Sequence, residues 1–428
     1  MKIRRIKADS QELERLLDLA QIGQNEYQEM VAEIGRQVRA QGDEAVFAYT
    51  LKYDKASINQ GNFLVSDEEI KEAYQKVDDD YIFALESAIK NIECFHVRQL
   101  RNSWMEPDEH GNILGQLFRP LQRVGIYVPG GTAAYPSSVL MNAIPAQVAG
   151  VEEIVMVSPP DQDGKMNPYT LVAASELGIS EIYKMGGAQA VFALALGTQT
   201  VKKVDLISGP GNIYVTLAKK MVYGEVNIDM LAGPSEILII ADKQANPVYL
   251  AADMMSQAEH DVMARSFLVT DSVDLIDKVE VEIERQVKNM SRRNIIEESL
   301  QRNGAFILTR DINEACMIAN KVAPEHLELM VDNPFGIISK IHNAGAIFMG
   351  QYTPEPVGDY FAGPNHILPT GGTARFYSPV TVDTFRKASS IIYYSQEGIG
   401  ADAPDIIKLA TVEGLTAHAN SVRVRKGK

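Results

Sequence analysis

From residue 123 onward, short apolar runs rich in β-branched residues alternate with segments of helical length. The runs are nearly continuous in apolar character, whereas a strand with one face in water alternates apolar and polar residues. They are therefore typical of parallel strands that helices cover on both faces, and the pattern predicts an α/β fold with doubly wound, Rossmann-like sheets. The predicted strands are RVGIYV (123–128), EEIVMVS (152–158), EIYKMG (181–186), KVDLISG (203–209), EILIIAD (236–242), RSFLVTD (265–271), GAFILTR (304–310) and AGAIFMG (344–350).

The segments between these runs, such as 137–151, 169–177 and 188–196, have the length of crossover helices. A further helical pattern begins at Pro247. Before residue 123 the chain is mostly helical in pattern, including its N-terminus, and residues 108–112 read as a turn. Because 428 residues exceed the size that one core normally serves, we expect two or more domains.

The formal net charge of −15 opposes binding to a phosphate backbone, so no nucleic-acid partner is expected. The charged N-terminus lacks the apolar region of a secretory signal. No apolar run approaches the roughly 20 residues that span a bilayer. We therefore expect a cytoplasmic protein without membrane association. Cys94 and Cys316 are the only cysteines, too few for a disulfide framework or a cysteine-built zinc site.

Four segments place a histidine close to a carboxylate or an amide. One is DYFAGPNHILPTGGTAR (359–375), whose glycines and prolines favour loop structure, where binding and catalytic groups are common. The others are SQAEH (256–260), APEHL (323–327) and EGLTAH (413–418). Any one of them could be an ordinary surface segment, but the repeated pattern indicates a site.

The first pair is suited to a metal ion. Gln257 and His260 are three residues apart on the predicted helix, a spacing that places both side chains on one face. The Gln oxygen and the imidazole could bind a metal together with Asp359 and His418. Such mixed oxygen and nitrogen ligands suit zinc, or manganese or cobalt in its place. A hydrogen-bonded histidine at a helix end is the simpler alternative for His260.

Glu325 and His326 are an adjacent acid and base just before a strand-like run. At a junction between loop and strand both can face one cleft, although a Pro-Glu helix start would explain Glu325 equally well. Nucleotide binding is not evident from motifs, since no G-x-G-x-x-G follows a strand. The glycines of Gly130-Gly131 and of the segment GPGN (209–212) do follow strands, and they could let the backbone approach a phosphate.

These segments, with RVGIYVPGGTAAYPSSVLMNAIPA (123–146), GGAQA (186–190), GPGN (209–212) and DMLAGPSEILIIAD (229–242), resemble the histidinol dehydrogenase family in their order and spacing over nearly the whole chain. The resemblance implies a zinc-assisted, NAD-dependent enzyme. Its expected reaction is the oxidation of L-histidinol through L-histidinal to L-histidine, the last two steps of histidine biosynthesis.

The resemblance also implies roles for single residues. His326 would be the general base, and Glu325 would activate water. One zinc per subunit would be held by Gln257, His260, Asp359 and His418. NAD would contact Tyr127, Gln189 and Asn212. The substrate would contact Ser235, Gln257, His260, His326, Asp359, His366, Glu413 and His418.

The domain division expected from the family has four parts. Residues 1–25 form an N-terminal arm. Residues 26–126 and 237–375 form a large α/β domain with the metal and catalytic residues. Residues 127–236 form an inserted α/β domain with the NAD contacts. Residues 376–428 form a C-terminal extension that is exchanged in a homodimer, so that each active site is shared. The alternative is a C-terminal helix packed on its own subunit.

Two other functions are compatible with the same residues. A zinc ion beside Glu325 and His326 could activate water in a hydrolase, or the protein could bind metal without catalysis. Aldehyde oxidation commonly uses a cysteine that forms a thiohemiacetal. Cys94 and Cys316 lie in helical patterns away from every motif, so the sequence disfavours a covalent cysteine route.

Overall fold

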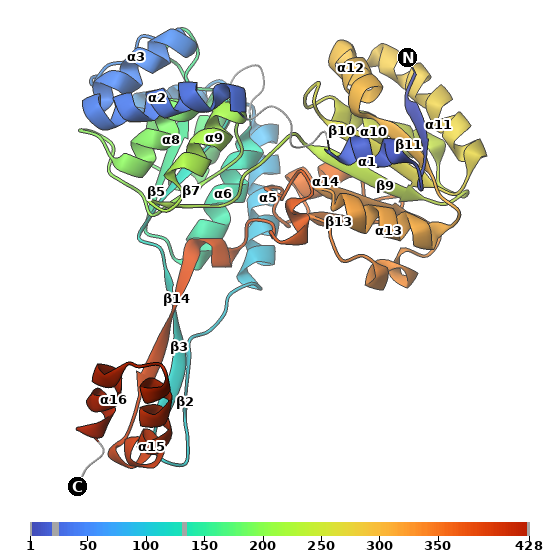
Figure 1. Cartoon of the computed structure of the whole chain (residues 1–428). Coiled ribbons are helices and arrows are strands. Elements are labelled where there is room, and N and C mark those ends of the chain that lie inside the picture. The colour runs from blue at the N-terminus through green and yellow to red at the C-terminus, as the bar shows by residue number, and fades with distance from the viewer. Residues whose placement is uncertain (1, 19–24, 131–134, 426–428) are drawn as a thin grey trace.

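The computed structural model describes residues 2–18, 25–130 and 135–425, and it contains two parallel sheets, each flanked by helices, with a smaller antiparallel sheet in a protruding arm (Figure 1). The five-stranded sheet has the order β6 (Glu181–Lys184), β5 (Glu153–Ser158), β4 (Arg123–Tyr127), β7 (Leu206–Ser208) and β8 (Asn227–Ile228). The six-stranded sheet has the order β1 (Arg4–Lys7), β11 (Ala305–Leu308), β10 (Arg265–Thr270), β9 (Glu236–Ala241), β12 (His326–Met330) and β13 (Ala346–Met349).

The two parallel sheets share one topology. In the five-stranded sheet, β5 and then β6 lie on one side of β4, and β7 and then β8 lie on its other side. In the six-stranded sheet, β10 and then β11 lie on one side of β9, and β12 and then β13 lie on its other side. Strand β1 pairs with β11 and forms the edge of the sheet there. The strand order therefore reverses between β4 and β7 and again between β9 and β12. Such switch points are where open α/β sheets usually bind ligands.

The α/β prediction is confirmed. All eight predicted runs form parallel strands, and every residue of β9 and β10 is buried, as nearly continuous apolar runs require. The helices that flank the five-stranded sheet are α2 (Asn25–Gln41), α3 (Asp43–Tyr53), α4 (Asp67–Tyr74), α5 (Asp79–Val97), α6 (Pro136–Ala149), α7 (Pro168–Glu176), α8 (Gly187–Leu196) and α9 (Ile213–Val222). Those of the six-stranded unit are α1 (Gln11–Asp18), α10 (Pro247–Ala258), α11 (Val273–Gln286), α12 (Arg293–Asn303), α13 (Ile312–Val322) and α14 (Glu355–Tyr360).

The packing of α2 to α5 differs from the predicted grouping of residues 26–126 with 237–375. Val31 and Ile34 of α2 share a core with Tyr127 of β4, and Ile92 of α5 packs with α6 and α7. These helices thus belong with the five-stranded sheet, as does the whole of β4. Amphipathic periodicity shows which face of a helix is buried, but it does not show which sheet that face meets.

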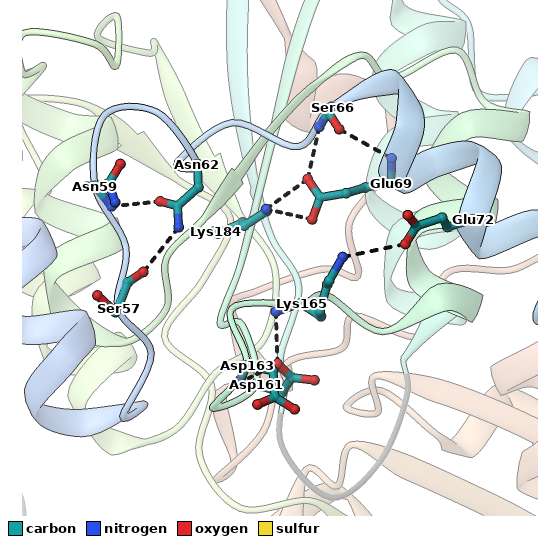
Figure 2. Close-up of polar contacts among 10 residues, drawn as sticks. All are labelled: Ser57, Asn59, Asn62, Ser66, Glu69, Glu72, Asp161, Asp163, Lys165 and Lys184. Atoms are coloured by element: carbon teal, nitrogen blue, oxygen red, sulfur yellow. Dashed lines mark hydrogen bonds and ion pairs between the residues drawn. The ribbon is translucent and has the colours of Figure 1, made fainter.

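A buried ion pair ties α4 to the five-stranded sheet (Figure 2). Lys184, at the end of β6, donates to both carboxylate oxygens of Glu69 at 2.7 and 2.8 Å. The same carboxylate accepts from the backbone of Ser66 and completes a capping box at the start of α4. Because the Lys184 side chain is only 4% exposed, this contact is part of the interior of the unit.

The two chain ends also differ from the prediction. Residues 1–25 include β1, an edge strand of the six-stranded sheet, where a helical pattern was expected; residue 1 and residues 19–24 lie outside the described part. Residues 376–428 do not form one extension, since Val382 and Phe385 are buried against α6. The arm itself begins with β14 (Arg386–Tyr393), which pairs with β3 (Ile113–Pro120) and, through it, with β2 (Trp104–Pro107).

The arm ends in two helices, α15 (Gln396–Val412) and α16 (Thr416–Arg423), which Figure 1 shows far from both parallel sheets. Strands β2 and β3 lie in the region where the sequence predicted mostly helix. The predicted turn at 108–112 connects them, and the Asp108 amide donates to the Asn112 carbonyl at 2.9 Å. Among the described residues, no helix is both long enough and apolar enough to cross a membrane.

Candidate active site

The site begins at the amino edge of the six-stranded sheet, where β9 and β12 start side by side. Glu325 accepts from the backbone N–H of Glu236 at 2.9 Å, and Nδ1 of His326 lies 3.1 Å from the carbonyl oxygen of the same residue. Both side chains therefore face the start of β9, as the predicted junction between loop and strand allows. Ala323, two residues earlier, has a φ of +51°, a strained backbone for a residue with a Cβ.

These contacts determine how the imidazole carries its proton. The Glu236 carbonyl can only accept, so the neutral ring of His326 carries its proton on Nδ1. Nε2 is then free to accept a proton, and it lies 3.7 Å from Oδ1 of Asp359, beyond direct hydrogen-bonding distance.

Burial and nearby charges shift the pKa values of both Glu325 and His326. Burial raises the pKa of Glu325, and the nearby His326 opposes that rise. Burial lowers the pKa of His326, but the carboxylates of Glu325, Glu355 and Asp359 outweigh it and raise the pKa. An acid and a base with perturbed pKa values, both buried at one sheet edge, are typical of a catalytic site.

A cluster suited to a cation adjoins this pair. His260, Glu355 and Asp359 each offer a ligand atom, and the three atoms lie within 4.8 Å of one another. Nε2 of His260 is 3.7 Å from Oε1 of Glu355. Gln257 is fully buried, and neither its amide oxygen nor its amide nitrogen has a hydrogen-bond partner in the described part of the chain. A bound metal would satisfy that oxygen, so the donor set fits an ion such as zinc.

The predicted helix carries Gln257 but not His260. Helix α10 ends at Ala258, and His260 lies in the following turn, where its N–H donates to the Gln257 carbonyl at 3.3 Å. This bond joins residues three apart, as in a 3₁₀ turn, so the turn continues directly from the end of α10.

His366 and Ser235 complete the residues that come together here. Nδ1 of His366 lies 3.0 Å from the backbone oxygen of Asp359. Ser235 immediately precedes β9, and its carbonyl accepts from the N–H of Arg265 at 3.0 Å. Nearby, the side chain of Asn365 donates to the carbonyl of Met141 in α6 at 2.6 Å, so this loop connects the site with the other parallel-sheet unit.

Two predicted residues do not join the site within one chain. Glu413 and His418 are both exposed at the end of the arm, at the turn before α16 and within it. Figure 1 shows this end of the arm far from α10 and α14, which carry Gln257 and Asp359.

The predicted NAD contacts lie at the carboxyl edge of the five-stranded sheet. Tyr127 ends β4, and its hydroxyl accepts from the N–H of Gly187 at 3.0 Å. Gln189 is 1% exposed, and its amide nitrogen has no hydrogen-bond partner within the described ranges. Asn212 caps α9, accepting from the amides of the helix's first turn. The structure thus brings all three residues near the switch point between β4 and β7.

The backbone at this edge is unusually close-packed. Gly209 has a φ of +122°, and a Cβ there would overlap the carbonyl oxygen of Tyr127. Only glycine therefore fits between β4 and α9 at this position. Gly131 lies outside the described residues, but Gly130 also packs tightly, because an added Cβ would meet Pro159 at 2.5 Å.

Glu355 and Glu236 belong to the site but were not among the predicted residues. Glu236 accepts from the N–H of Gly371 at 2.9 Å and faces the guanidinium of Arg265. Its only signal in the sequence was a carboxylate at the start of an otherwise apolar strand. Glu355 precedes Asp359 by four residues, a spacing that places two side chains on one face only where the segment is helical. The sequence alone did not predict a helix there.

The fold and the site together define an α/β enzyme with a buried acid–base pair beside a cluster of metal-ligating groups. Residues 18–426 match the family model described as histidinol dehydrogenase. The chain belongs to the histidinol dehydrogenase family, and it is an oxidoreductase.

Individual relatives agree with the family match. The chain is 60% identical to the histidinol dehydrogenase of Heliobacterium mobile over 92% of both chains. It is 51% identical to that of Bacillus licheniformis over 99% of both. The crystal structure of histidinol dehydrogenase from Elizabethkingia anophelis superposes with a TM-score of 0.94 at 38% identity, covering 99% of this chain and 98% of the other.

Proposed function

We propose that this enzyme oxidises L-histidinol to L-histidine in two NAD-dependent steps through L-histidinal, at the end of histidine biosynthesis. Family membership supports the substrate. The observation that carries the mechanism is the buried pair of Glu325 and His326 beside the cation cluster. The cytoplasmic location expected from the sequence stays a prediction.

In the proposed metal site Gln257, His260 and Asp359 of one subunit hold zinc together with His418 of the partner subunit. Zinc, when bound there, would supply a Lewis acid that the substrate amine and imidazole could chelate, which would orient the substrate. The unsatisfied amide oxygen of Gln257 supports this ligand set, since a buried polar atom needs a partner.

The first oxidation needs a base for the alcohol proton while a hydride leaves the carbon. His326 has the required atom, because its Nδ1 is committed to the Glu236 carbonyl and Nε2 is free to accept. The surrounding carboxylates raise the pKa of this imidazole. Asp359, when it holds the metal, would contribute less negative charge to His326, and the imidazole would then be closer to the neutral form that accepts a proton.

The second oxidation needs water to add to the aldehyde. Glu325 is held at one oxygen by the Glu236 N–H, and its raised pKa makes it an effective proton acceptor from water. The positions of the two cysteines disfavour aldehyde oxidation through a cysteine thiohemiacetal. Cys94 is on α5, and Cys316 is buried in α13, where burial raises the pKa of the thiol.

We propose the carboxyl edge of the five-stranded sheet as the NAD site, with contacts from Tyr127, Gln189 and Asn212. NAD would accept the hydride of each oxidation. The N-termini of α8 and α9 reach this edge, and helix N-termini favour the negative charge of a pyrophosphate. The unpartnered amide nitrogen of Gln189 offers a donor for the dinucleotide.

The proposed homodimer exchanges the arm, so that Glu413 and His418 complete the site of the other subunit. The arm exposes large apolar side chains that a second copy would cover. Ile392, Leu409 and Val412 are 71%, 67% and 72% exposed. Apolar exposure of this kind on a protruding segment indicates a protein interface.

The deciding experiment measures NADH formed per histidinol consumed, by absorbance at 340 nm. Two NADH per histidinol support the proposal, and one NADH would mean that the second oxidation does not occur here. A hydrolase would form no NADH, and a metal-binding protein without catalysis would turn over neither histidinol nor a hydrolysable substrate.

A further inference from the structure

Each of α10, β12 and α14, which carry site residues, also carries a carboxyl group that is almost fully buried. On α10, Asp253 precedes Gln257 by four residues. On α14, Glu355 precedes Asp359 by the same interval. On β12, Glu328 follows His326 by two. Each spacing places its two side chains on one face of a helix or strand. Asp253, Glu328 and Glu355 are 6%, 1% and 2% exposed, and we call them the carboxyl layer.

Hydrogen bonds join the carboxyl layer across the three elements. Oε1 of Glu328 accepts from the backbone N–H of Glu355 at 3.1 Å, at the start of α14. Ser256 of α10 donates to Oε2 of Glu355 at 2.9 Å. These two hydrogen bonds link α10, β12 and α14 beside the cation cluster, of which Glu355 is itself a member.

Oδ2 of Asp253 and Oε2 of Glu328 have no hydrogen-bond partner within the described chain. Burial raises the pKa of both carboxyl groups.

Burying a carboxyl group costs free energy of folding, and an apolar residue of similar size would often stabilise a fold as well or better. The contacts of these carboxyl groups therefore indicate a role other than stability. The link from Glu328 sets where α14 begins, and one turn later α14 presents Asp359 toward His326 and His260.

We propose that Glu328 is a positioning residue, which holds the start of α14 against β12 through the Glu355 amide so that Asp359 meets the other metal ligands. This inference rests on the proposed metal site. Glu328 would contribute by preorganising the ligand set, as hydrogen-bonded partners beyond the ligands do in other metal proteins.

The test compares two substitutions of one residue. Glu328→Gln keeps the size of the side chain and an oxygen for the Glu355 amide. Glu328→Leu removes that contact. The first readout is the zinc affinity of the purified full-length protein, measured by competition with a chromogenic chelator. We expect Glu328→Leu to bind zinc about 10- to 100-fold more weakly and Glu328→Gln to stay near wild type.

The second readout does not depend on the metal. Hydrogen exchange of the α14 amides, measured on metal-free protein, should become faster in Glu328→Leu and stay slow in Glu328→Gln. If the wild-type protein binds no zinc, the proposed metal site fails, but the exchange data still decide whether Glu328 holds α14.

A matched control separates positioning from general loss of stability. Ile307→Ala removes a fully buried side chain from β11, two strands away from β9, and should lower the melting temperature without changing zinc affinity. A folded Glu328→Leu protein with wild-type zinc affinity and unchanged α14 exchange would overturn the proposal, as would equal losses in the Gln and Leu variants.

Discussion

The two parallel sheets have the same strand order, yet the residues proposed to act in function gather at opposite edges. In the five-stranded sheet Tyr127 is the last residue of β4, and Asn212 follows the carboxyl end of β7. In the six-stranded sheet Glu325 and His326 stand at the amino ends, beside the start of β9. The usual rule for open α/β sheets therefore describes the first sheet but not the second.

Helix ends give a physical reason for the difference. Helices that follow parallel strands begin at the carboxyl edge, so their partly positive N-termini face it, as those of α8 and α9 do. They end at the amino edge, where partly negative C-termini collect. Gln257 and His260 lie at such an end of α10. One edge thus favours a dinucleotide phosphate, and the other favours a metal ion and a protonated amine.

The largest effect we expect is at the amino edge. His326→Ala removes the acceptor of the alcohol proton and should slow histidinol oxidation by about 100- to 10,000-fold. Zinc and NAD affinity should change little, because neither proposed site uses Nε2 of His326. Stopped-flow measurement of the first NADH and equilibrium titrations check both parts. A variant that lost NAD binding would show that the two edges are not separate in function.

Glu325→Gln should affect only the second half-reaction. The amide cannot take a proton from water, so oxidation of added histidinal should fall by about 100-fold or more, while oxidation of histidinol continues. Assaying each half-reaction separately measures the ratio. Equal losses in the two would contradict the assignment of water activation to Glu325.

Gly209, at the carboxyl edge of the five-stranded sheet, allows a test of the proposed NAD site that leaves the amino edge of the other sheet unchanged. Gly209→Ala introduces a Cβ that overlaps the Tyr127 carbonyl, so the segment leading to Asn212 must shift. We expect the KM for NAD to rise about tenfold or more, since displacements near 1 Å can cost about 100-fold, with zinc affinity unchanged. Gly178→Ala is the control, because its φ of +69° is also positive but nothing lies within 4 Å of the added Cβ.

The exchanged arm predicts recovery of activity from two inactive proteins. A heterodimer of His418→Ala and His260→Ala subunits would have both defects in one site and none in the other. Purified heterodimers should then show about half of the wild-type activity, by counting intact sites. If each site used its own arm, every site would keep one defect and the heterodimer would remain inactive.

The smallest expected effect concerns pH and stability. Burial raises the pKa of Asp54, at the end of α3, from 3.8 to about 6. The folded state then binds this proton more tightly than the unfolded state, so this group favours folding below about pH 4. Its contribution is lost as the pH rises to about 6 and stays constant above that.

Asp54→Asn removes this dependence. At pH 7 the variant should be more stable than wild type by about 1 kcal/mol, a figure reduced because Asp54 is partly exposed to solvent. Urea unfolding at several pH values measures the difference between the two proteins. A difference that is the same at pH 4 and pH 7 would contradict a raised pKa at Asp54.

Most secondary structure after residue 123 was predictable, because continuous apolar runs and crossover helices are local patterns. The strands of the arm were not, since β3 lies between β2 and β14 and exposes much of its surface. Within the site, adjacent Glu325 and His326 were recognisable from their motif. Glu328 was not, because a carboxylate within HLELM looks like the solvent-facing residue of a strand, whereas in the fold it is buried and the start of α14 lies against it.

The sequence by itself determined the α/β class, the family and the chemical groups available, because these depend on residue types and on their local order. Only the tertiary structure decided which sheet receives α2 to α5, which sheet edge holds each set of polar groups, and that Glu328 meets Glu355 at the start of α14. The physical reason is that these features depend on contacts between segments far apart in the chain. Such contacts are selected by packing and by the burial of charge, and local periodicity does not encode them.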